Sequence, residues 1–345
     1  MPKELLDKAF LKAKKSNAQV PERAGALMRG IRKETRRIEV VSTILTEELK
    51  KMVESIPNLT EIPEFYSKLC HLLVNNDELK LSLGKLNGTV PVITKLAKDT
   101  VKEISKCKNA KECAHLRKTY YGRISSIINK QKETLEYLTQ AADKLRTVPH
   151  LNLNMPCVVC AGAPNVGKSS LTAKISTFTP EISEYPFTTK GILIGNYKDE
   201  ANFVYFQVVD TPGILDRPME NRNWIEQQAI LALNLIASLV LFVFDPTMTS
   251  GYTFEHQKNL YFEIKEKFAD PKNIAVKVII NKIDLATPEE VQKIIDELKL
   301  NQNDYLEVNA KEGENTDKVI QFIISHFKDK QFVRELIHRV KRKKS

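Results

Sequence analysis

The chain has 345 residues, a formal net charge of +10, 42% hydrophobic residues and 5 cysteines. This composition suffices for one or two buried cores, and it excludes a disordered chain, a collagen and a disulfide scaffold. The first residues, MPKELLDKAFLKAKK, lack the apolar core of a secretory signal, and no apolar run is long enough to cross a bilayer, so we expect a cytoplasmic protein.

The charge is unevenly distributed along the chain. Lys and Arg exceed Asp and Glu by 11 over residues 1–150, fall short by 6 over 151–330 and exceed them by 5 over 331–345. We interpret these segments as an N-terminal helical domain, a central α/β domain and a basic C-terminal helix or tail. The basic ends favour an acidic partner, either nucleic acid or an anionic membrane surface, and simple solvation of basic faces is the alternative.

Residues 1–150 predict an all-α helical bundle. Glycine and proline are sparse there, and apolar residues recur at three- and four-residue spacing. We expect helices over about 22–56, 63–74, 91–107 and 111–146, the third of them beginning at Pro91.

The helix expected around 22–50 has two unlike faces at about 100° per residue. One face is apolar and suits burial in a bundle: Leu27, Ile31, Ile38, Val41 and Leu45. The opposite face carries a basic stripe, which we predict to bind RNA: Arg29, Arg32, Lys33, Arg36 and Arg37. The planar guanidinium suits phosphate recognition, although a solvated helix face remains the alternative.

From about residue 155 onward, short β-branched runs alternate with helical stretches. The expected strands are 157–161, 191–197, 203–209, 239–244, 276–280 and 305–308. The expected helices are 168–176, 221–236, 254–268, 288–298 and 315–327. This alternation is typical of an α/β domain with a mostly parallel sheet and helices on both faces.

A phosphate-binding loop of the form G-x-x-x-x-G-K-[ST] lies between the first expected strand and helix of this domain. Its members are Gly162, Ala163, Pro164, Asn165, Val166, Gly167, Lys168 and Ser169, followed by Ser170. The two glycines allow backbone amides to face the phosphates at a helix N-terminus. We expect Lys168 to reach the β- and γ-phosphates as a catalytic residue and Ser169 to bind Mg²⁺.

The segment Asp210-Thr-Pro-Gly213 follows the apolar strand 203–209. Asp210 at that position can hold Mg²⁺ through water, and the Gly213 amide can sense the γ-phosphate, which gives it a catalytic role. Ile214 stands where Ras-type enzymes carry the glutamine that orients the attacking water, so we predict slow intrinsic hydrolysis.

Two more motifs end the later strands and predict guanine recognition. They are Asn281-Lys282-Ile-Asp284 and Asn309-Ala310-Lys311. Asp284 can accept from N1–H and the 2-amino group of guanine, which adenine lacks, and the Ala310 amide is expected to meet guanine O6. Because open α/β sheets bind ligands at the carboxyl ends of their strands, the four motifs together predict a GTPase.

Nearby side chains leave two questions open. Thr188 and Thr189, between the first helix and the second strand, are the candidates for completing the Mg²⁺ shell. Arg217 and Arg222 are either in-cis stabilisers of developing charge or ordinary surface arginines.

The segments GAPNVGKSSL, EYPFTTKGI, DTPGILDRPMENRN and FDPTMTSGYTFEHQ resemble the Nog subfamily of Obg-type, translation-factor class GTPases. The segment PNLTEIPEFYSKLCHLLVNNDELKLSLGKLN resembles its helical domain, and the chain is similar to the short archaeal form. The resemblance implies an assembly factor of the large ribosomal subunit that binds pre-ribosomal RNA through both ends. It also implies that Thr189 is the catalytic, Mg²⁺-sensing threonine and that Asn165 binds K⁺.

The leading hypothesis is therefore a GTP-switched factor that binds large-subunit precursors and their rRNA, with no DNA partner and no stable membrane association. The basic tail would contribute through Arg339, Lys341, Arg342, Lys343 and Lys344. One alternative is a signalling GTPase at an anionic membrane surface, although the tail lacks a lipidation motif. Another is a GTPase subunit of an RNA-modification complex, which would need a partner because no second active site is visible.

Overall fold

The computed structural model describes residues 2–16, 25–186, 191–199, 204–213, 215–218 and 222–328. The chain divides into two compact units: residues up to 62 together with 73–146, and residues 63–72 together with 147 onward. Residues 63–72 thus belong to the second unit, although they lie inside the 1–150 segment predicted as a helical domain. The predicted tail, 331–345, lies outside the described residues.

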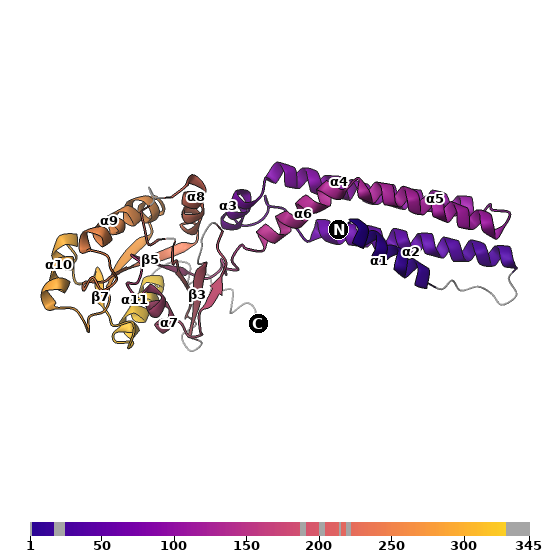
Figure 1. Ribbon diagram of the computed structural model, residues 1–345. Helices are drawn as coiled ribbons and strands as arrows, with labels where there is room; N and C mark the ends of the chain where they lie inside the picture. The colour runs from indigo at the N-terminus through magenta and orange to yellow at the C-terminus, as the bar shows by residue number, and fades with distance from the viewer. Residues whose placement is uncertain are drawn as a thin grey trace. The chain divides into compact units, whose positions relative to one another are not determined.

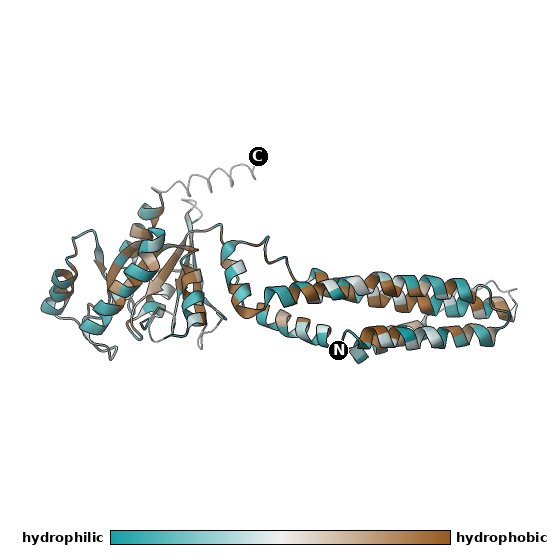
Figure 2. Ribbon diagram, turned by 90° about the horizontal axis from the view of Figure 1, so that it is seen from above, coloured by the Kyte–Doolittle hydropathy of each residue, from teal (hydrophilic) through white to brown (hydrophobic). Residues whose placement is uncertain are grey.

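Over its described residues, the first unit consists of helices and the turns between them (Figure 1). The helices are α1 (Pro2–Lys15), α2 (Ala26–Glu54), α4 (Asn76–Ile104), α5 (Ala110–Asn129) and α6 (Lys132–Leu145). Helix α2 packs against α1, α4 and α5, and its buried apolar residues recur at three- and four-residue spacing from Ile38 to Leu49. Hydrophobic residues follow the facing sides of these helices (Figure 2). The predicted helical bundle is confirmed.

Helix α4 runs straight through Pro91, so the predicted start of a helix at Pro91 is wrong. The start is set by Asn75, whose side chain accepts from the backbone amide of Asp77 at 3.0 Å. A proline inside a helix costs one backbone hydrogen bond. The buried side chains of Leu86, five residues before Pro91, and Ile93, two residues after it, hold the helix in the bundle and outweigh that cost.

The helix predicted over 111–146 is two helices, because the chain turns at residues 130–131 between α5 and α6. Helix α5 packs on α2 and α4, whereas α6 packs on α4. The turn lets the chain change its packing partners, which the unbroken pattern of apolar residues does not indicate.

A buried carboxylate organises the first half of α2. Glu34 is 7% exposed, and it pairs with Arg117 Nε of α5 at 2.6 Å and with Arg37 Nη1 at 3.3 Å. Arg37 is therefore half-buried and turned towards the bundle, unlike the other members of the predicted basic stripe. Those members are exposed: Arg29, Arg32, Lys33 and Arg36.

The apolar face of α2 is also shorter than predicted. Leu27 is 38% exposed and Ile31 is half-buried, so continuous burial on this face begins only at Ile38. The first turns of α2 depend on the Glu34 pairing more than on apolar packing.

The second unit contains a sheet whose described strands lie in the order β2-β3-β4-β1-β5-β6-β7. Their bounds are β1 (Cys157–Ala161), β2 (Glu181–Ser183), β3 (Ile192–Asp199), β4 (Val204–Asp210), β5 (Ala237–Phe244), β6 (Ala275–Ile280) and β7 (Tyr305–Glu307). Strands β4, β1, β5, β6 and β7 are parallel, and β2 and β3 are antiparallel to their neighbours. Strand β2 escapes sequence analysis because it is a three-residue edge strand with an exposed Ile182.

The helices of this unit are α3 (Glu64–Leu73), α7 (Lys168–Lys174), α8 (Trp224–Leu233), α9 (Phe254–Ile264), α10 (Pro288–Leu298) and α11 (Thr316–Lys328). A π-helical turn at 265–269 ends the helix that we expect to continue to Phe268. Helices α8 and α9 lie on one face of the sheet, and α7 and α11 lie on the other (Figure 1). The predicted α/β domain with a mostly parallel sheet is confirmed. None of the helices in the described ranges is both long and apolar enough to span a bilayer.

Side-chain hydrogen bonds join helix α3 to residue 151, and they join residue 152 to strand β4. The Tyr66 hydroxyl accepts from the Leu151 amide at 2.9 Å and donates to the Leu151 carbonyl at 2.7 Å. The Gln207 side chain of β4 bonds the amide and the carbonyl of Asn152 at 2.9 and 2.7 Å. Helix α3 and residues 147–156 are therefore part of the same packed body as β4.

The buried pairing of Glu34 predicts a large stability effect. Replacing Glu34 by alanine leaves two partly buried guanidinium groups without their carboxylate, and we expect a loss of about 3 kcal/mol in the unfolding free energy. Urea unfolding followed by far-UV circular dichroism measures the change. The control is Asp143→Ala, which removes an exposed pair with Arg146 and should cost less than about 0.5 kcal/mol. Equal losses in the two variants would contradict this assignment.

Candidate functional site

The phosphate-binding loop lies between the carboxyl end of β1 and the start of α7. Gly162 and Gly167 have φ angles of 134° and 101°, in the region that favours glycine. A Cβ atom on Gly162 would collide with the carbonyl oxygen of Val243, and one on Gly167 would collide with the Asn281 side chain. The loop is thus packed so closely against β5 and the 281 segment that only glycine fits at both ends.

Lys168 is buried, with its ammonium group inside this loop. Its Nζ donates to the carbonyl oxygens of Gly162 at 2.9 Å and Ala163 at 2.8 Å. A positive charge therefore lies where the motif places nucleotide phosphates, next to the N-terminus of α7. Asn165 is exposed at the tip of the loop with a φ of 61°.

Ser169 and Asp210 meet at the edge of the loop, where the Ser169 hydroxyl donates to Asp210 Oδ2. Asp210 is fully buried, and its other oxygen, Oδ1, has no hydrogen-bond partner. Burial raises the pKa of this carboxyl against the opposing effects of Ser169 and Lys168. A hydroxyl beside a carboxylate oxygen with unused lone pairs matches the hard oxygen ligands of Mg²⁺, so these residues fit the predicted metal.

Gly213, at φ 75°, is held through both of its peptide groups. Its amide donates to Asp216 Oδ2 at 2.6 Å, and its carbonyl accepts from Arg222 Nη1 at 2.9 Å. The Arg222 side chain is only 2% exposed, so it is not an ordinary surface arginine. In this structure it fixes the loop, and a role as an in-cis stabiliser of charge stays a prediction. Arg217 is exposed.

Three residues predicted to take part in hydrolysis lie outside the described residues: Thr188, Thr189 and Ile214. The same holds for the predicted RNA-binding residues of the tail, which are Arg339, Lys341, Arg342, Lys343 and Lys344. Their roles stay predictions.

Asn281, which is 3% exposed, joins three of the predicted motifs. Its Nδ2 donates to the Val166 carbonyl at 2.8 Å, and its Oδ1 accepts from the Ala310 amide at 2.9 Å. The Ala310 amide therefore donates within the protein, because a buried amide oxygen needs a donor. The contact of this amide with guanine O6 stays a prediction. Asp284 is exposed at the same edge of the sheet.

Asp245 is a site residue that sequence analysis missed. It follows β5, is 1% exposed, and accepts from Lys282 Nζ at 2.7 Å. It also accepts from the Thr247 hydroxyl at 2.6 Å and the Ser250 amide at 2.8 Å. Burial opposes ionisation, but hydrogen bonds from Lys282, Thr247 and Ser250 prevail and lower the pKa of Asp245.

The Asp245 carboxylate therefore fixes Lys282, whose backbone has a φ of 61°. The signal that would have revealed Asp245 is its position at the carboxyl end of a buried parallel strand, the position shared by Asp210 and Asn281.

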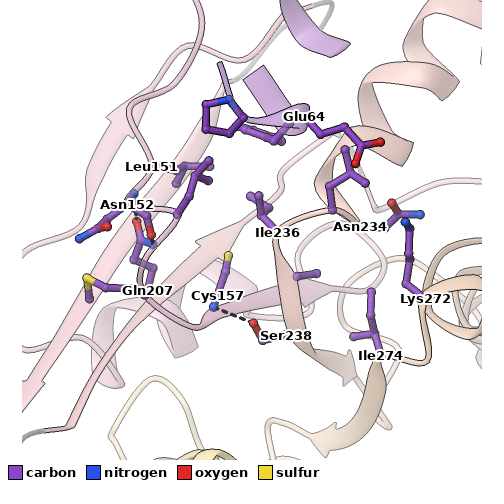
Figure 3. A pocket seen from close by; sticks show the side chains of 16 residues that line it. Glu64, Leu151, Asn152, Cys157, Gln207, Asn234, Ile236, Ser238, Lys272 and Ile274 are labelled. Atoms are coloured by element: carbon purple, nitrogen blue, oxygen red, sulfur yellow. Dashed lines mark hydrogen bonds between the residues drawn. The ribbon is translucent and has the colours of Figure 1, made fainter. Parts of the chain in front are cut away.

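A cavity of about 460 Å³ lies at the opposite edge of the sheet, where β1, β5 and β6 begin (Figure 3). Its lining includes Glu64, Gln207, Ser238 and Lys272, and none of the predicted nucleotide-binding residues. The described residues predicted to bind nucleotide thus lie at the carboxyl edge of the sheet, away from this cavity.

Two family models match the chain. The NOG1 N-terminal helical domain matches residues 1–152, and the model described as Nucleolar GTP-binding protein 1 (NOG1) matches residues 224–284. An uncharacterized protein of Methanocaldococcus jannaschii is 38% identical over 293 residues, which are 85% of this chain and 81% of the relative.

Nucleolar GTP-binding protein 1 of Drosophila melanogaster is 35% identical over 257 residues, which are 74% of this chain. The matched part is 39% of that relative's length. A crystal structure described as nucleolar GTP-binding protein 1 from Plasmodium falciparum is similar at 28% identity with a TM-score of 0.46. It covers 56% of this chain and 97% of its own.

Replacing Asp210 by asparagine should raise thermal stability and lower Mg²⁺-dependent nucleotide affinity. Because the folded-state pKa is raised, ionisation costs stability as the pH rises above the usual value of 3.8. We expect the nucleotide-free variant to unfold at a higher temperature than the wild type at neutral pH, with the difference vanishing below that value. Mg²⁺-dependent nucleotide affinity should fall at least about tenfold.

Differential scanning fluorimetry in EDTA across pH measures the stability, and calorimetric titration with Mg²⁺ measures the affinity. Asp284→Asn is the control, since it neutralises an exposed carboxylate at the same edge and should leave thermal stability unchanged. A less stable Asp210→Asn protein at neutral pH would refute the assignment of an unfavourable buried charge.

The Asp245–Lys282 pair predicts a coupled loss of nucleotide affinity. We expect Asp245→Asn and Lys282→Met each to weaken GDP and GTP binding equally, by about tenfold. Because both substitutions break the same contact, the double variant should lose no more nucleotide affinity than either single variant. Titration with a fluorescent nucleotide measures the constants. Glu297→Gln breaks an ion pair with the same 2.7 Å separation at the surface and should change nothing, and additive losses would exclude the coupling.

Proposed function

This chain belongs to the NOG1 family, and from that membership we propose that it is a GTP-hydrolysing switch that takes part in assembly of the large ribosomal subunit. The observation that supports the nucleotide part best is the convergence of four motifs at one edge of the sheet, three of them joined through Asn281. The match spans 39% of the Drosophila relative's length, so the ribosomal role is our proposal for the chain itself.

We assign the phosphates to the backbone of residues 162–170 and to Lys168. The Lys168 ammonium, already inside the loop, would exchange the Gly162 and Ala163 carbonyls for phosphate oxygens and neutralise charge that develops on them during hydrolysis. Asp284 would bind the guanine base, with Lys282, Asn281 and the 309–311 loop around it.

Ser169, Asp210 and Thr189 would hold Mg²⁺, which neutralises phosphate charge when bound. Asn165, exposed at the tip of the loop, is the proposed K⁺ ligand. Ile214 stands where Ras-type enzymes carry a glutamine, so the residue after Gly213 has no side-chain amide to orient the attacking water. We therefore propose a slow intrinsic rate that a partner raises.

We assign RNA binding to the first unit. Four exposed cationic residues follow one face of α2: Arg29, Arg32, Lys33 and Arg36. Residues 1–150 carry a charge balance of +11, whereas 151–330 carry −6, so the nucleotide-binding unit does not supply the basic surface. Arg37 is withdrawn from this surface by Glu34. The tail residues 339–344 would add a second basic contact, in a protein that we place in the cytoplasm.

The proposal predicts salt-sensitive association that depends on the nucleotide state. We expect the chain to sediment with large-subunit precursors more strongly with a non-hydrolysable GTP analogue than with GDP. Changing Arg29, Arg32, Lys33 and Arg36 together to glutamine should weaken binding and lower the slope of log affinity against log salt by about 3, because each phosphate contact contributes about 0.7–0.9.

The matched control removes four exposed lysines from α4: Lys80, Lys85, Lys95 and Lys98. It makes the same change in net charge and should leave the slope nearly unchanged. Equal, salt-insensitive sedimentation in both nucleotide states would refute the switch. Flotation with anionic liposomes instead of sedimentation with RNA would favour a membrane role.

A further inference from the structure

The Gly213 amide is already occupied in this structure. It donates to Asp216 Oδ2 at 2.6 Å, a charge-assisted hydrogen bond between a backbone N–H and a carboxylate. Asp216 lies three residues after Gly213 and is 8% exposed, so solvent competes little for its oxygens. From the sequence, this is the amide that we expect to sense the γ-phosphate of GTP.

The carboxylate is held in place by Arg222. Arg222 Nη2 lies 3.5 Å from Asp216 Oδ1, and Nη1 donates to the Gly213 carbonyl at 2.9 Å. The same guanidinium donates to the Arg217 carbonyl at 3.5 Å. Because the Arg222 side chain is buried, these contacts form one closed arrangement around the Gly213 peptide groups.

We propose that Asp216 sets the preference between GDP and GTP by competing with the γ-phosphate for the Gly213 amide. This inference rests on the proposed function. A backbone N–H makes one strong hydrogen bond, so the carboxylate and a γ-phosphate oxygen exclude each other there. Both are anions, and their proximity adds repulsion to the exclusion.

The competition acts on one nucleotide only. GDP has no γ-phosphate and leaves the bond between Gly213 and Asp216 intact, whereas GTP must displace Asp216 before it gains the amide. Arg222 retains the displaced carboxylate as a partner, which makes the exchange reversible. Asp216 thus lowers the affinity for GTP relative to GDP and holds the loop in the GDP form until the γ-phosphate arrives.

The test measures the affinity of the full chain for GDP and for a non-hydrolysable GTP analogue, both with Mg²⁺, by calorimetric titration. Asp216→Ala frees the amide, and we expect analogue affinity to rise about tenfold with GDP affinity unchanged. Asp216→Asn keeps a neutral acceptor beside Arg222 and should give a smaller rise. This second variant keeps the test valid if the alanine protein fails to fold.

A spectroscopic readout separates this role from simple support of the loop. Trp224 is the single tryptophan of the chain, is 66% exposed, and lies two residues after Arg222. In the wild type we expect the analogue, but not GDP, to change its emission. In Asp216→Ala the nucleotide-free emission should already resemble that of the analogue-bound wild type.

The control is Asp317→Ala, an exposed carboxylate on α11 that should change neither affinity nor emission. If the Asp216 variants lost affinity for both nucleotides equally, Asp216 would only support the loop structurally, and the inference would be overturned. A loss of affinity for the analogue alone would also overturn the inference, because it would show that Asp216 favours GTP. A wild-type chain that binds neither nucleotide would refute the proposed function itself, with the inference.

Discussion

The carboxyl edge of the sheet in the second unit depends on the side chain of Asn281. Its amide bonds the phosphate loop on one side and the 310 loop on the other, while its own backbone amide donates to the Phe244 carbonyl at 2.9 Å. Three loops that are far apart in sequence therefore share one buried residue. The close approach explains why residue 167 is glycine, since any side chain there would displace Asn281.

The loops around this group are fixed by buried charges of two kinds. Asp245 is fully satisfied, and its ionised form is favoured by Lys282 and the hydroxyls near it. Asp210 is not satisfied, because one of its oxygens lacks a donor. A carboxylate whose hydrogen bonds are satisfied stabilises the fold, whereas a buried carboxylate with an unpaired oxygen costs stability. The two roles are thus distinguished by hydrogen bonding, although both residues end a parallel strand.

From the sequence we could place three motifs at the ends of strands, because each directly follows a run of apolar residues: the 162–170 loop, Asp210 and the 281–284 motif. Their nucleotide chemistry stays a prediction. The expectations from sequence failed where the outcome depends on packing between distant residues. Pro91 marks no boundary because buried neighbours in α4 outweigh one lost hydrogen bond. Arg222 and Arg37 carry the same charge as their exposed neighbours. Only the folded positions of Asp216 and Glu34 show that each arginine is paired with a carboxylate and turned away from the surface.

The second unit is made of two separate pieces of the sequence, and the hydrogen bonds of Tyr66 join them. Its helix α3 is encoded before the long helices α4, α5 and α6, and the rest of the unit after them. A fragment that began at residue 150 would lack α3, and it would leave the amide and the carbonyl of Leu151 without the Tyr66 hydroxyl.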